Sequence, residues 1–179
     1  MIKKILVGTL LASAVTVASA NTAAPYVGAG LGVNVNTSSS GVNTFFTRTM
    51  PVSIFAGYGG VVNQNFYLAG EFTGVLGAGE LTSKGNSVKT TYGYGLSVLP
   101  GLMLSDHTLA FARVGFVRSR FTNMNTYGNG GQIGLGLQTS LTQNVDVRGE
   151  YDFTAYKTVS NVGAPRSDAA SVSLVYKFD

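Results

Sequence analysis

The feature that most constrains the fold is a strict alternation of apolar residues with small or polar ones, repeated along almost the whole chain. From Tyr26 to Asn36, for example, Val, Ala and Leu occupy the odd positions, whereas Gly, Tyr and Asn occupy the even positions. Successive side chains of a β-strand point to opposite faces, so this pattern predicts a strand with one apolar face. Eight such stretches follow one another, beginning near residues 26, 51, 66, 90, 110, 132, 145 and 170. The alternation therefore predicts an all-β chain.

The composition agrees with this prediction and excludes several other classes of protein. Gly accounts for 24 of the 179 residues, and only 11% of residues are charged, against about 25% in ordinary soluble domains. The low charge and a mean hydropathy of +0.23 exclude a disordered chain. The absence of Cys excludes disulfides and thiolate metal ligands, and the single His forms no paired-His metal motif. We therefore expect no metal and no cofactor.

The first 20 residues have the three parts of a secretory signal peptide. Lys3 and Lys4 supply the positive start, the stretch 5–17 is apolar, and residues 18–20 form a small-x-small cleavage site. A membrane-spanning helix needs about 20 apolar residues, so the length of this stretch disfavours an uncleaved anchor. The mature chain should then begin at Asn21, and residues 21–179 should form one domain.

The lengths of the connections decide between a soluble β-sandwich and a membrane barrel. Short connections around 62–65, 105–107 and 142–144 alternate with long ones at 37–48, 77–87, 121–130 and 157–167. Outer-membrane barrels have this layout, with short periplasmic turns and long external loops, whereas a sandwich does not need it. The sequence thus predicts an eight-stranded antiparallel up-and-down transmembrane β-barrel in a Gram-negative outer membrane. Because the strand number is even, both termini should lie in the periplasm.

Such a sheet must close, because every backbone N–H and C=O group within hydrocarbon needs a hydrogen-bond partner. A closed ring has no edge to extend, so a monomer is expected. Pro100 falls within the fourth predicted strand, and a proline in mid-sheet loses a ladder hydrogen bond. We therefore expect Pro100 near the periplasmic rim, where a bulge could accommodate it.

The inward face of the predicted barrel carries glycines, a few bulky side chains and several charges. The glycines leave space for Phe55, Phe111 and Arg113, because an eight-stranded barrel is just wide enough for side chains to fill. Isolated charges are costly in such an interior, so they should pair. We expect Glu71 to pair with Arg148 or Arg113, and Glu150 to pair with the remaining arginine. This network predicts a structural polar plug; a catalytic carboxylate pair and an open channel are the alternatives.

Five segments carry a resemblance to a known family, and their order and spacing matter more than any one of them. They are Pro25–Gly32, Leu68–Phe72, Ala112–Phe116, Arg148–Tyr151 and Leu174–Phe178. With these segments the chain resembles the OmpA-like and OmpX-like eight-stranded outer-membrane barrels, which are related to the opacity-type surface proteins. The resemblance covers essentially all of residues 25–179.

The resemblance implies roles for particular residues. An internal salt-bridge network would fall on Glu71, Arg113 and Arg148. The end of the chain is similar to the aromatic-x-Phe signal that the barrel-insertion machinery reads, which would fall on Tyr176 and Phe178. The chain departs from the family at Leu99, which stands near the place of an inward Lys, so the network should be smaller here.

The outer end of the predicted barrel is basic, and two of its arginines are placed to meet lipid. Arg118 and Arg120 have the lipid-facing parity, just above Phe116. Charge-assisted hydrogen bonds favour phosphate, so we expect contact with lipopolysaccharide; solvated rim charges are the alternative. Phe45 and Phe46 are a conspicuous apolar pair in the first long connection, which fits either an adhesive contact or a strand extension.

Three functions remain open from the sequence. The first is a structural and surface-interaction protein, with adhesion as one form, whose long connections meet host or surface ligands. The second is a small porin-like channel. The third is a lipid A-modifying enzyme, although the adjacent Ser105, Asp106 and His107 fall in a turn predicted to be periplasmic, away from the outer leaflet. We therefore expect a non-enzyme, and an exported barrel should not meet nucleic acid.

Overall fold

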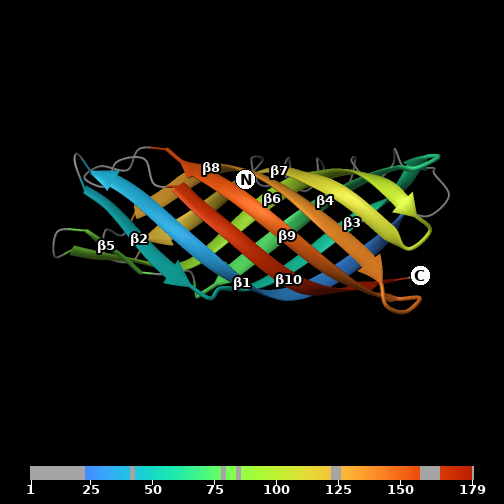
Figure 1. The fold of residues 1–179 in the computed structure, drawn as a ribbon, viewed down its shortest axis with the longest axis horizontal. Coiled ribbons are helices and arrows are strands. Elements are labelled where there is room, and N and C mark those ends of the chain that lie inside the picture. Colours follow the sequence, from blue (N-terminus) through green and yellow to red (C-terminus); the bar gives the residue numbers. More distant parts are fainter. Residues whose placement is uncertain are drawn as a thin grey trace, which may run out of the picture.

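The computed structural model describes residues 23–40, 43–77, 80–83, 86–121, 126–157 and 166–178, and all regular structure in these ranges is antiparallel β (Figure 1). Among these residues there is no helix long and apolar enough to cross a membrane. The first strands are β1 (Ala24–Ser40), β2 (Asn43–Thr49), β3 (Val52–Asn63), β4 (Phe66–Leu76) and β5 (Glu80–Ser83). The others are β6 (Asn86–Ser105), β7 (Thr108–Phe121), β8 (Thr126–Ser140), β9 (Val145–Tyr156) and β10 (Arg166–Lys177).

These ten segments build the eight predicted barrel strands. β2 pairs with the C-terminal part of β1, and β3 pairs with the N-terminal part of β1. β2 and β3 therefore form one barrel strand, which is interrupted at Met50 and Pro51. Proline lacks the N–H group that would continue the ladder, which explains the break at this point. β5 pairs only with β6 and forms a small hairpin above the barrel wall. The predicted eight-stranded antiparallel barrel is confirmed.

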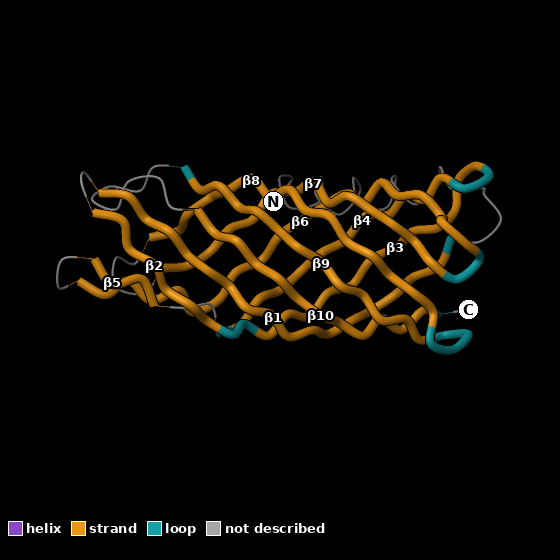
Figure 2. Tube along the Cα trace, viewed as in Figure 1, coloured by secondary structure: helices purple, strands orange, loops and turns teal. Residues whose placement is uncertain are grey.

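The first and last strands close the ring. β1 and β10 pair without interruption from Tyr26↔Lys177 to Thr37↔Arg166, and the tilted strands wrap round the long axis in Figure 2. The short turns β3–β4, β6–β7 and β8–β9 lie at one end together with the C-terminus (Figure 1). The β1–β2 and β5–β6 hairpins lie at the opposite end, which we call the hairpin end. We call the end with the short turns and the C-terminus the turn end.

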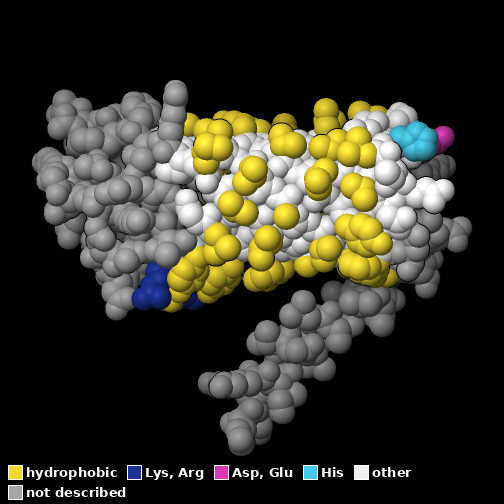
Figure 3. All heavy atoms as spheres, turned by 90° about the horizontal axis from the view of Figure 1, so that it is seen from below, with side chains coloured by type: hydrophobic (Ala, Val, Ile, Leu, Met, Phe, Trp, Pro, Cys, Tyr) yellow, Lys and Arg dark blue, Asp and Glu magenta, His cyan; other side chains and the backbone are white. Residues whose placement is uncertain are grey.

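The alternation of the sequence sorts side chains between the two faces as predicted. Leu135 is 70% exposed and Phe116 79% exposed on the outer surface, whereas Phe111 of the opposite parity is 4% exposed. Figure 3 shows hydrophobic side chains spread over the described outer surface, with Lys and Arg gathered near one end. An apolar outer surface and a polar or aromatic interior are the arrangement that a lipid bilayer requires of a barrel.

The expected long loops are shorter than predicted. Much of 37–48 belongs to β1 and β2, much of 77–87 to β5 and β6, and much of 121–130 to β8. The Ser, Thr and Asn residues of these segments are compatible with strands once hairpin pairing extends beyond the apolar belt. Residues 158–165, the centre of the fourth predicted loop, lie outside the described part. Phe45 and Phe46 belong to β2, and their side chains also lie outside it.

Pro100 does not sit at a bulge. It stays in register with Leu68 of β4. On the other side the ladder is interrupted between Val98↔Val114 and Gly101↔Phe111, without a change of register. The missing N–H of proline therefore falls on the β7 side, where one gap in the ladder absorbs it.

Candidate functional site

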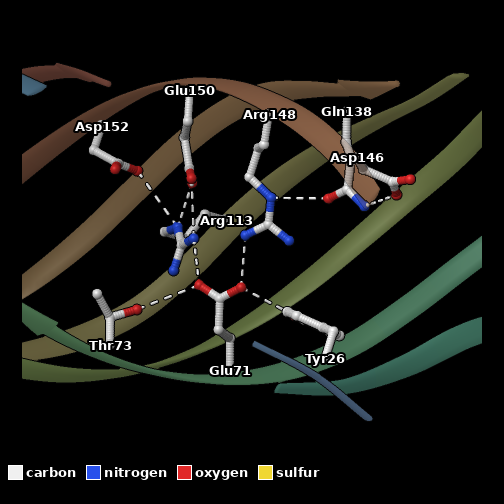
Figure 4. A network of polar contacts seen from close by, with 9 residues as sticks. All are labelled: Tyr26, Glu71, Thr73, Arg113, Gln138, Asp146, Arg148, Glu150 and Asp152. Carbon is white, nitrogen blue, oxygen red and sulfur yellow. Dashed lines mark hydrogen bonds and ion pairs between the residues drawn. The ribbon is translucent and has the colours of Figure 1, made fainter. Parts of the chain in front are cut away.

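The predicted network residues lie together in the barrel interior, and Figure 4 shows that Glu71 is their centre. Glu71 on β4 accepts hydrogen bonds from Arg113 of β7 at 2.7 Å and from Arg148 of β9 at 2.6 Å. The Tyr26 hydroxyl of β1 donates a third bond to Glu71, at 3.0 Å. The predicted pairs Glu71–Arg148 and Glu150–Arg113 are both present, and Glu71 pairs with Arg113 as well. One carboxylate joins two guanidinium groups, because its two oxygens face different arginines.

Arg113 links Glu71 to two further carboxylates on β9. Its Nε and Nη2 atoms both donate to Glu150, the second bond at 3.0 Å. The Nε atom also lies 3.6 Å from Asp152 Oδ1, which has no hydrogen-bond partner among the described residues. Thr73 Oγ1 donates to Glu71 at 3.3 Å. Glu71, Glu150 and Asp152 thus share one guanidinium group.

On its other side Arg148 continues the network toward the turn end. Its Nε atom donates to Gln138 Oε1 at 2.8 Å, and Gln138 Nε2 donates to Asp146 Oδ2 at 2.6 Å. Asp146 Oδ1 lies 2.9 Å from Lys177 Nζ. Asp146, Asp152 and Lys177 belong to the inward charges that the alternation predicts, whereas Tyr26 and Gln138 were not predicted as members of the network. Inward parity was the signal that could have found these two, together with the direct pairing of Gln138 with Arg148.

Aromatic rings enclose Arg148, which is 2% exposed. Its guanidinium carbon lies 4.7 Å from the ring centroid of Phe55, 5.2 Å from that of Phe111 and 5.5 Å from that of Tyr26. Rings attract a cation over their faces, which offsets part of the cost of burying the charge. Together the rings and the ion pairs span the interior at this level.

Inward glycines make room for these rings, as predicted. A Cβ atom on Gly28 would lie 2.3 Å from the Phe55 ring, and one on Gly136 would lie 2.3 Å from the Phe111 ring. Each glycine is the direct cross-strand partner of the phenylalanine that covers it. Leu99 is 1% exposed and belongs to the same packed region.

Toward the hairpin end the interior contains a cavity of about 140 Å³. Arg113, Glu150 and Asp152 border it, and its walls carry mainly small or neutral polar residues, such as Asn34 and Ser53. This volume suits a few water molecules. The carboxylates that border the cavity share Arg113, and both oxygens of Glu71 are occupied by arginines. The geometry favours structural ion pairing over proton exchange with a substrate.

The two arginines of the outer rim have different surroundings. The Arg118 guanidinium lies 4.6 Å from the ring centroid of Tyr127, and the side chain is exposed. Arg120 Nη1 donates to the Tyr92 hydroxyl at 3.3 Å. Tyrosines at this level form part of an aromatic girdle of the kind that marks a membrane–water interface. Each of the two arginines thus lies beside a tyrosine.

Two other predicted features lie at the turn end. Tyr176 and Phe178 are both exposed, with ring centroids 5.0 Å apart. The His107 backbone N–H donates to Ser105 Oγ at 3.4 Å in an exposed turn, and no hydrogen bond joins the two side chains. The described residues hold no group of three metal-ligating side chains. Ser105 and His107 therefore lack the side-chain contact that a nucleophile and its base require.

Several solved structures share this fold. Neisserial surface protein A (NspA) has a TM-score of 0.63 and 20% identity, and the match covers 88% of this chain and 100% of that one. Ail, the attachment invasion locus protein of Yersinia pestis, has a TM-score of 0.54 and 11% identity, covering 87% and 99%. Ail in complex with the heparin analogue sucrose octasulfate has a TM-score of 0.55 with 11% identity and the same coverage.

No curated protein matches the chain significantly. The sequence profile of the outer membrane protein β-barrel domain, in contrast, matches residues 5–178. This range contains every strand, the interior network and the aromatic pair at the C-terminus. The chain therefore belongs to the outer membrane protein β-barrel domain family.

Proposed function

We propose that this protein is a surface-interaction barrel of the Gram-negative outer membrane, with a sealed interior and no catalytic activity. The observation that carries the proposal is the polar network from Lys177 to Glu150, packed among Tyr26, Phe55 and Phe111. Large, mutually bonded side chains at this level leave little room for ions. This plug closes the interior, and hairpins extend from the other end of the barrel. The arrangement favours binding of ligands by the outer segments over transport through the barrel.

The proposal includes an orientation and a maturation step. Residues 1–20 are removed as a signal peptide, both termini and the short turns face the periplasm, and the hairpin end faces outward. Because β1 pairs with β10, the ring has no open edge, and the protein is a monomer. Tyr176 and Phe178 are exposed at the end of the last strand, where the barrel-insertion machinery can read them.

The candidate ligands lie at the hairpin end. Ail, which shares the fold, has been crystallised with a heparin analogue, so the fold is compatible with an anionic surface ligand. In this chain the exposed Arg118 is placed to contact phosphates of lipopolysaccharide, whereas Arg120 bonds to Tyr92. Segments 37–48, 77–87, 121–130 and 157–167 supply the surface for host ligands. Surface protease treatment of whole cells should cut these segments and spare the short turns.

Planar-bilayer recording separates the sealed barrel from a small channel. Purified full-length protein, shown to be folded by its heat-dependent gel mobility, should give no steady conductance. Arg148→Ser should introduce openings because it removes the side chain that the three rings surround, whereas Ser53→Ala in the cavity wall should not. Steady ion-sized openings of the unaltered protein would overturn the proposal.

Mass analysis of lipid A separates the non-enzyme from a lipid-modifying enzyme. Lipid A incubated with the folded protein should keep its mass, because no hydrogen bond joins the side chains of Ser105 and His107. Loss or gain of an acyl chain would contradict this part of the proposal and leave the barrel assignment intact.

A further inference from the structure

We propose that a groove on the lipid-facing surface of β4 and β6–β8 binds one lipid A molecule of lipopolysaccharide, with Arg118 and Lys157 holding a phosphate and the groove holding an acyl chain. This inference rests on the proposed location and orientation of the barrel. It assigns the phosphate contact to Arg118 and Lys157, which line the same groove, and not to the pair Arg118 and Arg120 that the sequence predicted.

The strand register builds the groove from two adjacent rows of outward residues. In the lower row, Phe116 pairs with Gly131, and Gly131 pairs with Ala155. In the upper row Arg118 pairs with Asn129, and the Lys157 backbone N–H donates to the Asn129 carbonyl at 3.0 Å. Small residues in the lower row thus lie directly below polar and cationic residues in the upper row.

The lower row gives the groove its depth. A Cβ atom on Gly131 would meet nothing within 4 Å, so the surface is open there. Phe116 stands beside Gly131 and is 79% exposed, which makes it a wall. The groove has a volume of about 520 Å³, and apolar side chains such as Phe72 and Leu96 line it. That volume is in the range of sites that bind small organic ligands, and the lining suits an acyl chain.

The upper row supplies charge without competition from acids. Arg118 and Lys157 both line the groove, both are exposed, and neither forms an ion pair with a carboxylate of the described residues. The Tyr127 ring holds the Arg118 guanidinium in place at 4.6 Å. Arg120 is absent from the groove lining and bonds to Tyr92. A guanidinium and an ammonium group on one groove favour an anion with several acceptor oxygens, such as a phosphate.

The position of the groove on the barrel favours lipid A over other phosphate-bearing ligands. The groove lies at the interfacial level, where Tyr92, Tyr94 and Tyr127 gather, and it belongs to the hairpin half of the barrel. In the proposed orientation this level faces the outer leaflet, where a phosphorylated glycolipid with several acyl chains is the neighbouring molecule. The juxtaposition of cations above an apolar groove matches a phosphate attached to acyl chains.

The test measures binding of purified lipid A to the folded full-length protein in detergent. Arg118→Ser combined with Lys157→Ser should weaken binding about tenfold or more, because it removes the charge-assisted hydrogen bonds to the phosphate. Gly131→Leu should weaken binding similarly because it fills the groove and leaves both cations in place. Arg120→Ser, on the same strand but outside the groove, is the matched control and should change affinity less than about twofold.

Different lipids distinguish the possible occupants. Dephosphorylated lipid A should bind at least about tenfold more weakly, and phosphatidylglycerol vesicles should not compete. Equal binding without phosphate would overturn the role of the cations, and equal competition by phosphatidylglycerol would overturn lipid A as the occupant. Loss of binding in all three variants, Arg120→Ser included, would overturn the groove. If unaltered protein is folded and non-conducting but binds no lipid A, the groove fails and the proposed function stands.

Discussion

The two halves of the barrel interior are enclosed by the same strands but filled differently. Toward the turn end, Tyr26, Phe55, Leu99 and Phe111 pack round Arg148 and leave it 2% exposed. Toward the hairpin end, smaller side chains leave a cavity of about 140 Å³. Because strand number sets the width of the ring, the difference comes from the volumes of the inward side chains. A barrel can therefore be sealed on one level and hollow on the next without a change in its wall.

The largest expected effect comes from the centre of the packed half. Glu71→Gln should destabilise the barrel by about 3–5 kcal/mol, because it leaves two buried guanidinium groups without their shared charge. Urea unfolding in lipid vesicles, followed by gel mobility, measures the loss. Ser53→Ala in the cavity wall is the control and should change stability by less than about 0.5 kcal/mol. Equal losses for the two variants would show that the halves do not differ.

A change of side-chain volume should separate the halves at an intermediate magnitude. Ala69 is 3% exposed in the packed half, and Ala69→Leu should cost about 1–3 kcal/mol through overpacking. Ser53→Leu adds bulk next to the cavity and should cost less than about 1 kcal/mol. Urea midpoints of the two variants test the comparison, and a larger loss for Ser53→Leu would place the empty space elsewhere.

The smallest effect is expected at the boundary between the halves. Asp152→Asn should change stability by less than about 1 kcal/mol, because Arg113 keeps its bonds to Glu71 and Glu150. The same unfolding titration measures it. A loss as large as that of Glu71→Gln would show that Asp152 belongs to the packed network and not to its edge.

The sequence alone was sufficient for the wall of the barrel and for the direction of its side chains. The alternation along each strand assigns Leu135 to the outer surface and Phe111 to the interior without any knowledge of the partner strands. Side-chain direction in a strand is a local property. Beyond the apolar belt the sequence predicted long connections, with a strand extension at Phe45 and Phe46 as one alternative, whereas the structure has hairpins there. Ser, Thr and Asn there carry no apolar face, so the periodic signal ends where the hydrocarbon ends, although the hydrogen bonding continues.

The contacts of the interior were predictable only in part. Inward parity identified Glu71, Arg113, Arg148 and Glu150 as neighbours in one narrow space. It left open which of the two arginines Glu71 meets and did not indicate that it meets both, because contacts between non-adjacent strands depend on the stagger and tilt of the ring. The bulge that could have accommodated Pro100 is absent, because a gap in one ladder is sufficient for its missing N–H group.

The seam between β1 and β10 has a consequence for the order of assembly. The first strand to be made finds its last partner only when the final residues of the chain arrive, since Tyr26 pairs with Lys177. A truncated chain that lacks β10 keeps two edge strands with unpaired backbone groups, which can pair with a strand of another chain. Completion of the polypeptide is thus also the event that ends its capacity to aggregate, and a nonsense mutation near the 3′ end of the gene should be more toxic to the cell than a deletion of the whole gene.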